Sequence, residues 1–108
     1  MDNAFEIEPQ ALAPMMKSPE QKLFLIDCRE PWEYELAHIE GATLIPMRKV
    51  FQSVEQIPQD APVVVYCHHG MRSLNVTGWL RRQGIEAQSL RGGIDRWSLE
   101  IDPAVSRY

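Results

Sequence analysis

The stretch VVVYCHHGMRS at residues 63–73 decides the fold. Three valines and a tyrosine follow Pro62, and such a continuous, β-branched apolar run is typical of a strand buried on both faces of a sheet. The run stops at Cys67, and a short loop then leads to Arg72, where we expect a helix to begin. A buried strand, a tight loop and a helix in this order are typical of a parallel α/β sheet.

The segments on either side of this stretch alternate in the same way. Apolar positions at helical spacing predict a helix over residues 72–83, which Gly84 ends. Further strands are expected over residues 5–8, 23–27, 42–45 and 87–90, and further helices over residues 10–17, 31–37, 47–57 and 95–99. The alternation predicts an α/β domain with a parallel sheet that helices cover on both faces.

Composition sets outer limits on the function. The chain has 108 residues, 44% of them hydrophobic and 24% charged, which suits one globular domain with a single core. A net charge of −4 argues against a nucleic-acid partner, and no apolar run is long enough to span a membrane. The first residues lack the basic flank and apolar run of a signal peptide. We therefore expect a cytoplasmic protein with reduced thiols and no membrane partner.

The loop from Cys67 to Arg72 has the features of an anion-binding nest. Successive backbone N–H groups in so short a loop tend to point inward, and the helix N-terminus adds free donors and partial positive charge. Gly70 permits a positive φ, and Arg72 brings a fork of donors that matches oxyanions. Such a nest favours a sulfur in its thiolate form, and it suits a bound anion or a persulfide equally well.

Two other interpretations of Cys67 carry less weight. Cys67, His68 and His69 as metal ligands would be adjacent, and adjacent residues converge poorly on one tetrahedral ion. Cys28 and His38 would complete such a site only by an accident of the fold. A core cysteine would have apolar or turn-forming neighbours rather than an arginine in the next turn. We therefore expect a nucleophile in an anion cradle and no metal.

Four segments together resemble the motifs of the rhodanese-like sulfurtransferases, in order and in spacing. The loop CHHGMRS at residues 67–73 resembles the active-site loop of that family. The other segments are DCRE at 27–30 with EY at 33–34, HIEGA at 38–42, and GGIDRW at 92–97. The one small departure is Ala37, where the family often has glycine. The match covers nearly the whole chain, so residues 1–108 are expected to form a single rhodanese-like domain.

This resemblance implies both a fold and a reaction. It implies a five-stranded parallel sheet with helices on both faces, and an enzyme without metal or organic cofactor. Cys67 would take sulfane sulfur from a donor, often thiosulfate, hold it as a persulfide, and pass it to a thiophilic acceptor such as cyanide or a thiol. An alternative is a sulfur-carrier or interaction module that a protein partner loads.

A third alternative is a phosphatase or arsenate reductase on the same fold. Those relatives have five residues between the loop cysteine and arginine, whereas this chain has four between Cys67 and Arg72. The shorter loop makes a tighter cradle, which suits the terminal sulfur of a persulfide better than a whole phosphate. The loop length therefore favours sulfur transfer.

The expected roles of single residues follow from this interpretation. Arg72 would also attract the sulfonate end of thiosulfate, and Ser73 would either cap the helix or hydrogen-bond the sulfur. Asp27 would oppose a thiolate unless it is neutralised, so we expect either Arg29 to neutralise it or backbone amides to tie it into support of the loop. The residues expected to form the cradle, mainly through backbone N–H groups, are His68, His69, Gly70, Met71 and Arg72.

Overall fold

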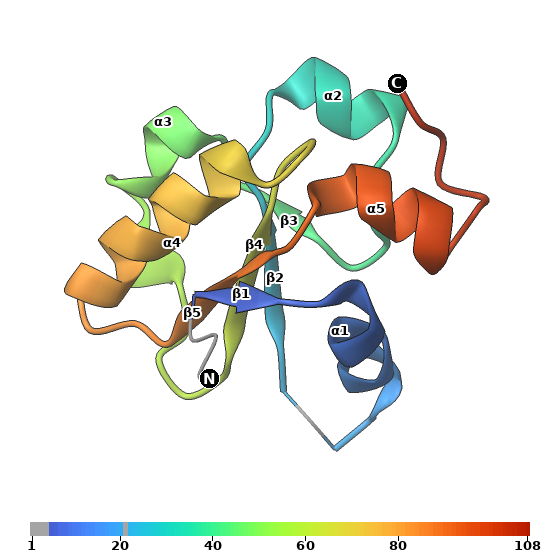
Figure 1. Ribbon diagram of the computed structural model, residues 1–108. Helices are drawn as coiled ribbons and strands as arrows, with labels where there is room; N and C mark the ends of the chain where they lie inside the picture. The colour runs from blue at the N-terminus through green and yellow to red at the C-terminus, as the bar shows by residue number, and fades with distance from the viewer. Residues whose placement is uncertain (1–4, 21) are drawn as a thin grey trace.

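The computed structural model describes residues 5–20 and 22–108. Its sheet has five parallel strands in the order β1-β5-β4-β2-β3, as Figure 1 shows. The strands are β1 (Glu6–Ile7), β2 (Phe24–Asp27), β3 (Thr43–Leu44), β4 (Val63–Tyr66) and β5 (Ala87–Leu90). The predicted α/β class and the five-stranded parallel sheet are therefore confirmed.

Helices occupy most of the segments between the strands. They are α1 (Pro9–Lys17), α2 (Pro31–Leu36), α3 (Met47–Val50), α4 (Met71–Arg82) and α5 (Gly93–Glu100), together with the short 3-10 helix η1 (Val54–Gln56). The continuous helix predicted over residues 47–57 is wrong. The hydroxyl of Ser53 donates to the carbonyl oxygen of Lys49 at 2.8 Å, and this side-chain bond competes with the backbone bond that a continuing helix would make.

Two apolar clusters fill the two faces of the sheet, and β4 contributes to both. Val63 and Val65 pack into one cluster with side chains of α3 and α4, whereas Val64 and Tyr66 pack into the other with side chains of α1 and α5. Figure 1 shows these helix pairs on opposite sides of the sheet. Because both faces of β4 are buried, the strand is apolar throughout.

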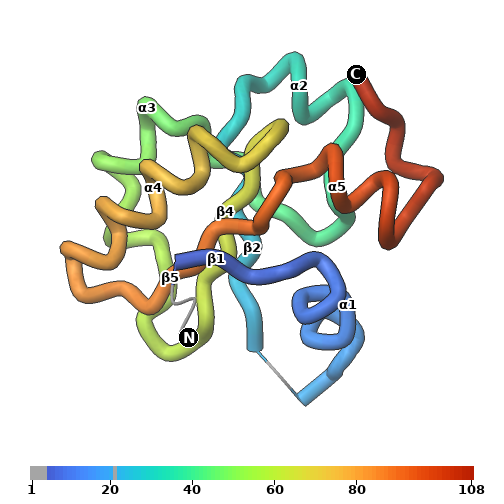
Figure 2. Tube along the Cα trace, viewed as in Figure 1, coloured from blue at the N-terminus to red at the C-terminus, as the bar shows by residue number. Residues whose placement is uncertain are grey.

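The carboxyl edge of the sheet carries the segments that build the site. β4 lies between β2 and β5, so the residues that follow these three strands lie close together. Beyond this edge lies α2, and the C-terminal segment returns from α5 towards it, as Figure 2 shows. Within the described residues, no helix has both the length and the apolar character needed to cross a membrane.

Candidate active site

The sulfur of Cys67 lies in a cradle of hydrogen-bond donors at the start of α4. Cys67 directly follows β4 and is 1% exposed. Its Sγ accepts hydrogen bonds from the backbone N–H groups of Gly70, at 3.1 Å, and Ser73, at 3.3 Å. The hydroxyl oxygen of Ser73 lies 3.4 Å from the same sulfur. Donors that converge at a helix N-terminus stabilise negative charge on the sulfur.

The geometry of the loop turns its amides inward and its carbonyls outward. Gly70 has a φ of +108°, which a residue with a side chain adopts only with strain, and this conformation directs its N–H towards the sulfur. On the outer side, the N–H groups of Ile94 and Asp95 donate to the carbonyl oxygens of Cys67 and His68 at 2.9 and 3.1 Å. The first turn of α5 therefore holds the back of the loop.

Gly93 makes this close approach possible. A Cβ at this position would lie 2.6 Å from the carbonyl oxygen of Cys67 and closer still to that of His68. The GGIDRW segment is the signal that pointed to this glycine, but only the fold shows that Gly93 lies against the cysteine loop.

Ser73 faces the sulfur rather than the helix end. The N-cap of α4 is Gly70, and no side chain caps it. The buried Ser73 hydroxyl lies 2.7 Å from the hydroxyl of Ser89 in β5, as well as beside Cys67. Of the two roles considered for Ser73, the structure therefore places it for the hydrogen bond to sulfur. Ser89 was missed by sequence reasoning, because nothing local marks it.

Arg72 forms a paired ion bridge with Glu33 of α2. Its two terminal nitrogens donate to the two oxygens of Glu33 at 2.8 and 2.9 Å. Hydrogen bonds from Arg72 lower the pKa of Glu33 to about 2, and those to Glu33 raise the pKa of Arg72. The guanidinium is therefore not a free cation, and an anionic substrate would share it with Glu33.

The start of α2 explains why Glu33 faces the loop. Pro31 occupies the first helical position, and Glu33 stands two residues later. The Glu33 side chain accepts the backbone N–H of Glu30 at 2.9 Å, which is one half of a capping box. This local bond fixes the carboxylate at the end of α2 that lies over the carboxyl edge of the sheet.

Asp27 and Arg29 form a fully buried ion pair at the end of β2. Arg29 donates to the two Asp27 oxygens at 2.8 and 2.6 Å, and both side chains are 0% exposed. The hydroxyl of Tyr66 also donates to Asp27, and Arg29 donates to the carbonyl oxygen of Ala37. The structure thus shows the pairing expected for Asp27. Their hydrogen-bond partners lie outside the cysteine loop, so the support they give it passes through other residues.

His68 lies between two aromatic rings. Its imidazole stacks on Tyr108 at 3.9 Å between ring centroids and 7° between planes, and on His69 at 3.9 Å and 27°. Burial lowers the pKa of His68, so its neutral form is favoured. His68 therefore contributes a flat wall beside the loop rather than a fixed positive charge. Tyr108 was not among the residues singled out from the sequence.

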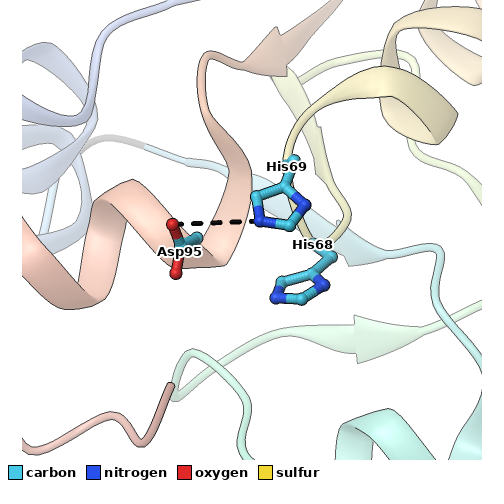
Figure 3. Close-up of side chains that lie close together, drawn as sticks. All are labelled: His68, His69 and Asp95. Atoms are coloured by element: carbon cyan, nitrogen blue, oxygen red, sulfur yellow. Dashed lines mark ion pairs between the residues drawn. The ribbon is translucent and has the colours of Figure 1, made fainter. Parts of the chain in front are cut away.

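His68, His69 and Asp95 form a cluster of possible metal-ligating atoms, all within 4.8 Å of one another (Figure 3). Cys67 is not a member, since its sulfur faces Gly70 and Ser73, so the ligand set considered from the sequence is not brought together. Two groups already compete for Asp95. Arg107 donates to it at 2.9 Å, and His69 lies 3.9 Å from it.

Cys28 and His38 lie apart from the cradle. Cys28 is packed in the apolar cluster on the α3 and α4 side, where burial raises the pKa of its thiol well above the ordinary range. His38 is exposed, stacks on Tyr34 at 3.9 Å, and has a ring nitrogen 2.9 Å from the Tyr34 carbonyl oxygen.

Fold and site together define a class of protein, namely α/β domains that present a cysteine in an anion-binding loop at the end of a central parallel strand. Within this class, the family model for the rhodanese-like domain matches residues 8–100. The chain belongs to the rhodanese-like domain family.

Two curated relatives and one solved structure show how far the similarity extends. The chain is 34% identical to the thiosulfate sulfurtransferase GlpE of Vibrio cholerae, over 90% of this chain and 91% of that protein. It is 35% identical to the probable adenylyltransferase/sulfurtransferase MoeZ of Mycobacterium tuberculosis over 94% of this chain, but it spans only 26% of that protein. The crystal structure of a rhodanese-related protein from Thermoplasma volcanium superposes with a TM-score of 0.84 at 26% identity, covering 96% of this chain and 99% of that one.

Proposed function

We propose that this protein is a sulfurtransferase in which Cys67 takes sulfane sulfur from a donor such as thiosulfate and passes it to a thiophilic acceptor such as cyanide or a thiol. The observation that carries the proposal is the surroundings of Cys67 Sγ at the N-terminus of α4, where two backbone N–H groups donate to the sulfur and the Ser73 hydroxyl lies 3.4 Å from it. The similarity to sulfurtransferases, GlpE among them, supports it. A cytoplasmic location remains part of the same proposal.

The transfer proceeds in two displacement steps. The Cys67 thiolate attacks the outer sulfur of thiosulfate, a new sulfur–sulfur bond forms, and sulfite leaves with the electron pair of the old one. The acceptor, for example cyanide, then attacks the outer sulfur of the persulfide and leaves as thiocyanate, which restores the thiolate. The N–H groups of Gly70 and Ser73 stabilise the anionic sulfur before and after transfer.

The size of the cradle favours sulfur over a whole oxyanion. Four residues separate Cys67 from Arg72, and the first turn of α5 fixes the back of the loop at the Cys67 and His68 carbonyls. Phosphatase or arsenate reductase chemistry is therefore the less favoured alternative.

The first test is intact-mass spectrometry after incubation with thiosulfate. The protein is expected to gain one sulfur atom, and cyanide is expected to remove it as thiocyanate. Cys67→Ser should show neither change, because it lacks the accepting thiol. Cys28→Ala is the matched control, since it removes the other thiol of the chain, which lies in the core. Sulfur uptake by Cys67→Ser, or no uptake by the unmodified protein from thiosulfate, would contradict the proposal.

A second candidate function is a sulfur carrier that a protein partner loads. Met71, within the loop, is 74% exposed, and Trp32, beside Glu33 on α2, is 63% exposed. Exposed apolar side chains next to a reactive sulfur suit contact with a protein surface. A cysteine desulfurase with free cysteine should then load Cys67 faster than thiosulfate does, and Met71→Ser should slow only the protein-dependent loading. Equal loading of Met71→Ser and the unmodified protein would argue against a carrier.

A further inference from the structure

Tyr108 joins the C-terminal segment to the candidate active site through its hydroxyl and its ring. The hydroxyl accepts a hydrogen bond from Arg29 at 2.8 Å and donates one to Glu33 at 2.6 Å. The ring stacks on His68 and meets the edge of Trp32 with ring centroids 6.1 Å apart. None of the sequence motifs described above includes Tyr108, so these contacts assign it a place in the site that the motifs do not indicate.

The Tyr108 hydroxyl completes the hydrogen bonds of a buried carboxylate. Glu33 is 4% exposed, and each of its two oxygens accepts two donors. One oxygen accepts from Arg72 and from the backbone of Glu30, and the other accepts from Arg72 and from Tyr108. Without the hydroxyl, one oxygen of a buried charge would lose a donor, which is costly away from water. The Glu33–Arg72 pair would then have freedom to turn.

The same hydroxyl links the rigid end of β2 to the loop cation. Asp27 holds Arg29, Arg29 donates to Tyr108, Tyr108 donates to Glu33, and Glu33 holds Arg72. The first pair of this chain is completely buried, whereas the Arg72 side chain is 34% exposed. The bonds thus connect a fully buried pair in the core to the partly exposed guanidinium of Arg72.

We propose that Tyr108 is a positioning residue that fixes the orientation of the Arg72 guanidinium through Glu33, so that it meets the anionic end of the sulfur donor. This inference rests on the proposed sulfurtransferase function and adds a determinant of donor recognition to it. The hydroxyl serves recognition of the donor, whereas the ring, by stacking on His68, supports the wall of the loop. The two parts of the side chain can therefore be tested separately.

The test compares Tyr108→Phe with Tyr34→Phe. Tyr34 stacks on His38 with the same 3.9 Å and 7° geometry, but on the outer surface of α2, so it is a matched control. Loss of the Tyr108 hydroxyl should raise the KM for thiosulfate about tenfold, as expected for a lost hydrogen bond to a charged group, with the rate at saturating thiosulfate within about twofold. Cyanide discharge of the loaded protein should be unchanged, and Tyr34→Phe should match the unmodified protein.

A second comparison separates positioning from a general structural effect. If Tyr108 acts through Glu33, Tyr108→Phe should have no further effect on the KM in a Glu33→Gln background. An undiminished effect in that background would overturn the inference, as would an unchanged KM in Tyr108→Phe itself. Either result would leave the proposed function standing, provided that the unmodified protein gains sulfur from thiosulfate. Failure of the unmodified protein to gain sulfur would reject the proposed function itself.

Discussion

Arg72 shows at the residue scale how a tertiary partner changes the meaning of a motif. In the sequence, an arginine five residues after a cysteine indicates a cation for an oxyanion. In the structure, both terminal nitrogens of this side chain already bind Glu33. Glu33 of α2 therefore neutralises most of the charge of Arg72. The negative charge on the sulfur of Cys67 is stabilised chiefly by backbone N–H groups.

The ionisation of Glu33 leads to a prediction about acid stability. Its pKa is about 2 in the folded protein against an ordinary 4.5, because Arg72 binds the charged form. Because the pKa of Glu33 is lower in the folded state, the ionised carboxylate adds to the free energy of unfolding. This contribution is complete above about pH 4.5 and is lost as the pH falls from about 4.5 to about 2. Glu33→Gln should therefore be less stable than the unmodified protein at pH 6, and the difference should shrink over that range.

The measurement is urea unfolding at a series of pH values. Glu35→Gln, an exposed position on the same helix, serves as the control and should follow the unmodified protein throughout. If the free energies of unfolding of Glu33→Gln and the unmodified protein differ by a constant amount from pH 6 to pH 2, the Glu33 charge does not contribute to stability.

At the scale of elements, the loop depends on two helix N-termini. The N-terminus of α4 faces the sulfur, and the N-terminus of α5 binds the carbonyl oxygens on the other side of the same loop. The free N–H groups at a helix N-terminus need acceptors, and the loop supplies them with the sulfur of Cys67 and two carbonyl oxygens. The same hydrogen bonds fix the loop between the two helices. This double arrangement keeps the amides around Cys67 converging on its sulfur.

Gly93→Ala should disrupt this arrangement. Gly93 has a φ of +65°, and an added Cβ would collide with the backbone of the loop, which cannot move aside like a flexible side chain. The strained φ and the collision together should cost about 4 kcal/mol of unfolding free energy, measured by urea denaturation. Gly84→Ala is the control, since its φ is +85° but its Cβ would meet no atom within 4 Å, so only about 1–2 kcal/mol is expected. Equal losses in the two variants would show that the loop contact is unimportant.

At the scale of the whole molecule, the Asp27–Arg29 pair ties together distant parts of the chain. Arg29 contacts Asp27 at the end of β2, the carbonyl of Ala37 after α2, and the hydroxyl of Tyr108 in the C-terminal segment. Tyr66 of β4 donates to Asp27 and accepts from the backbone of Ile39. The network therefore anchors the segments beyond the carboxyl edge of the sheet to its two central strands.

Arg29→Met should be strongly destabilising. The change leaves the Asp27 charge buried without its partner, and breaking a buried pair in this way typically costs about 3–5 kcal/mol. Lys22→Met is the matched control, because Lys22 pairs with Asp60 on the exposed surface at 3.4 Å, and such pairs contribute no more than about 1 kcal/mol. Urea unfolding of both variants gives the comparison. A loss in Arg29→Met no larger than that in Lys22→Met would contradict a central role for the network.

The sequence by itself determined the parts of this protein that local interactions control. The apolar run at residues 63–66 predicted β4 with its correct bounds, since burial on both faces requires apolar side chains at every position. The loop from Cys67 to Arg72 predicted a nest at a helix N-terminus, because backbone N–H groups of consecutive residues build it. The helix expected over residues 47–57 shows the limit of such reasoning, since α3 ends at Val50 and the Ser53 hydroxyl binds the carbonyl oxygen of Lys49 that a longer helix would use.

Only the tertiary structure decided which distant groups complete the site. Glu33 is 39 residues from Arg72 and 75 from Tyr108, and Ser89 is 16 residues from Ser73. Long-range pairs of this kind form because parallel strands bring the ends of β2, β4 and β5 to one edge and the C-terminal segment folds back over it. Local propensity carries no information about such pairs, since their geometry is set by how the helices pack on the sheet. Consecutive residues of the loop form the cradle around Cys67. Glu33, the first turn of α5 and Tyr108 join it only once the chain is folded.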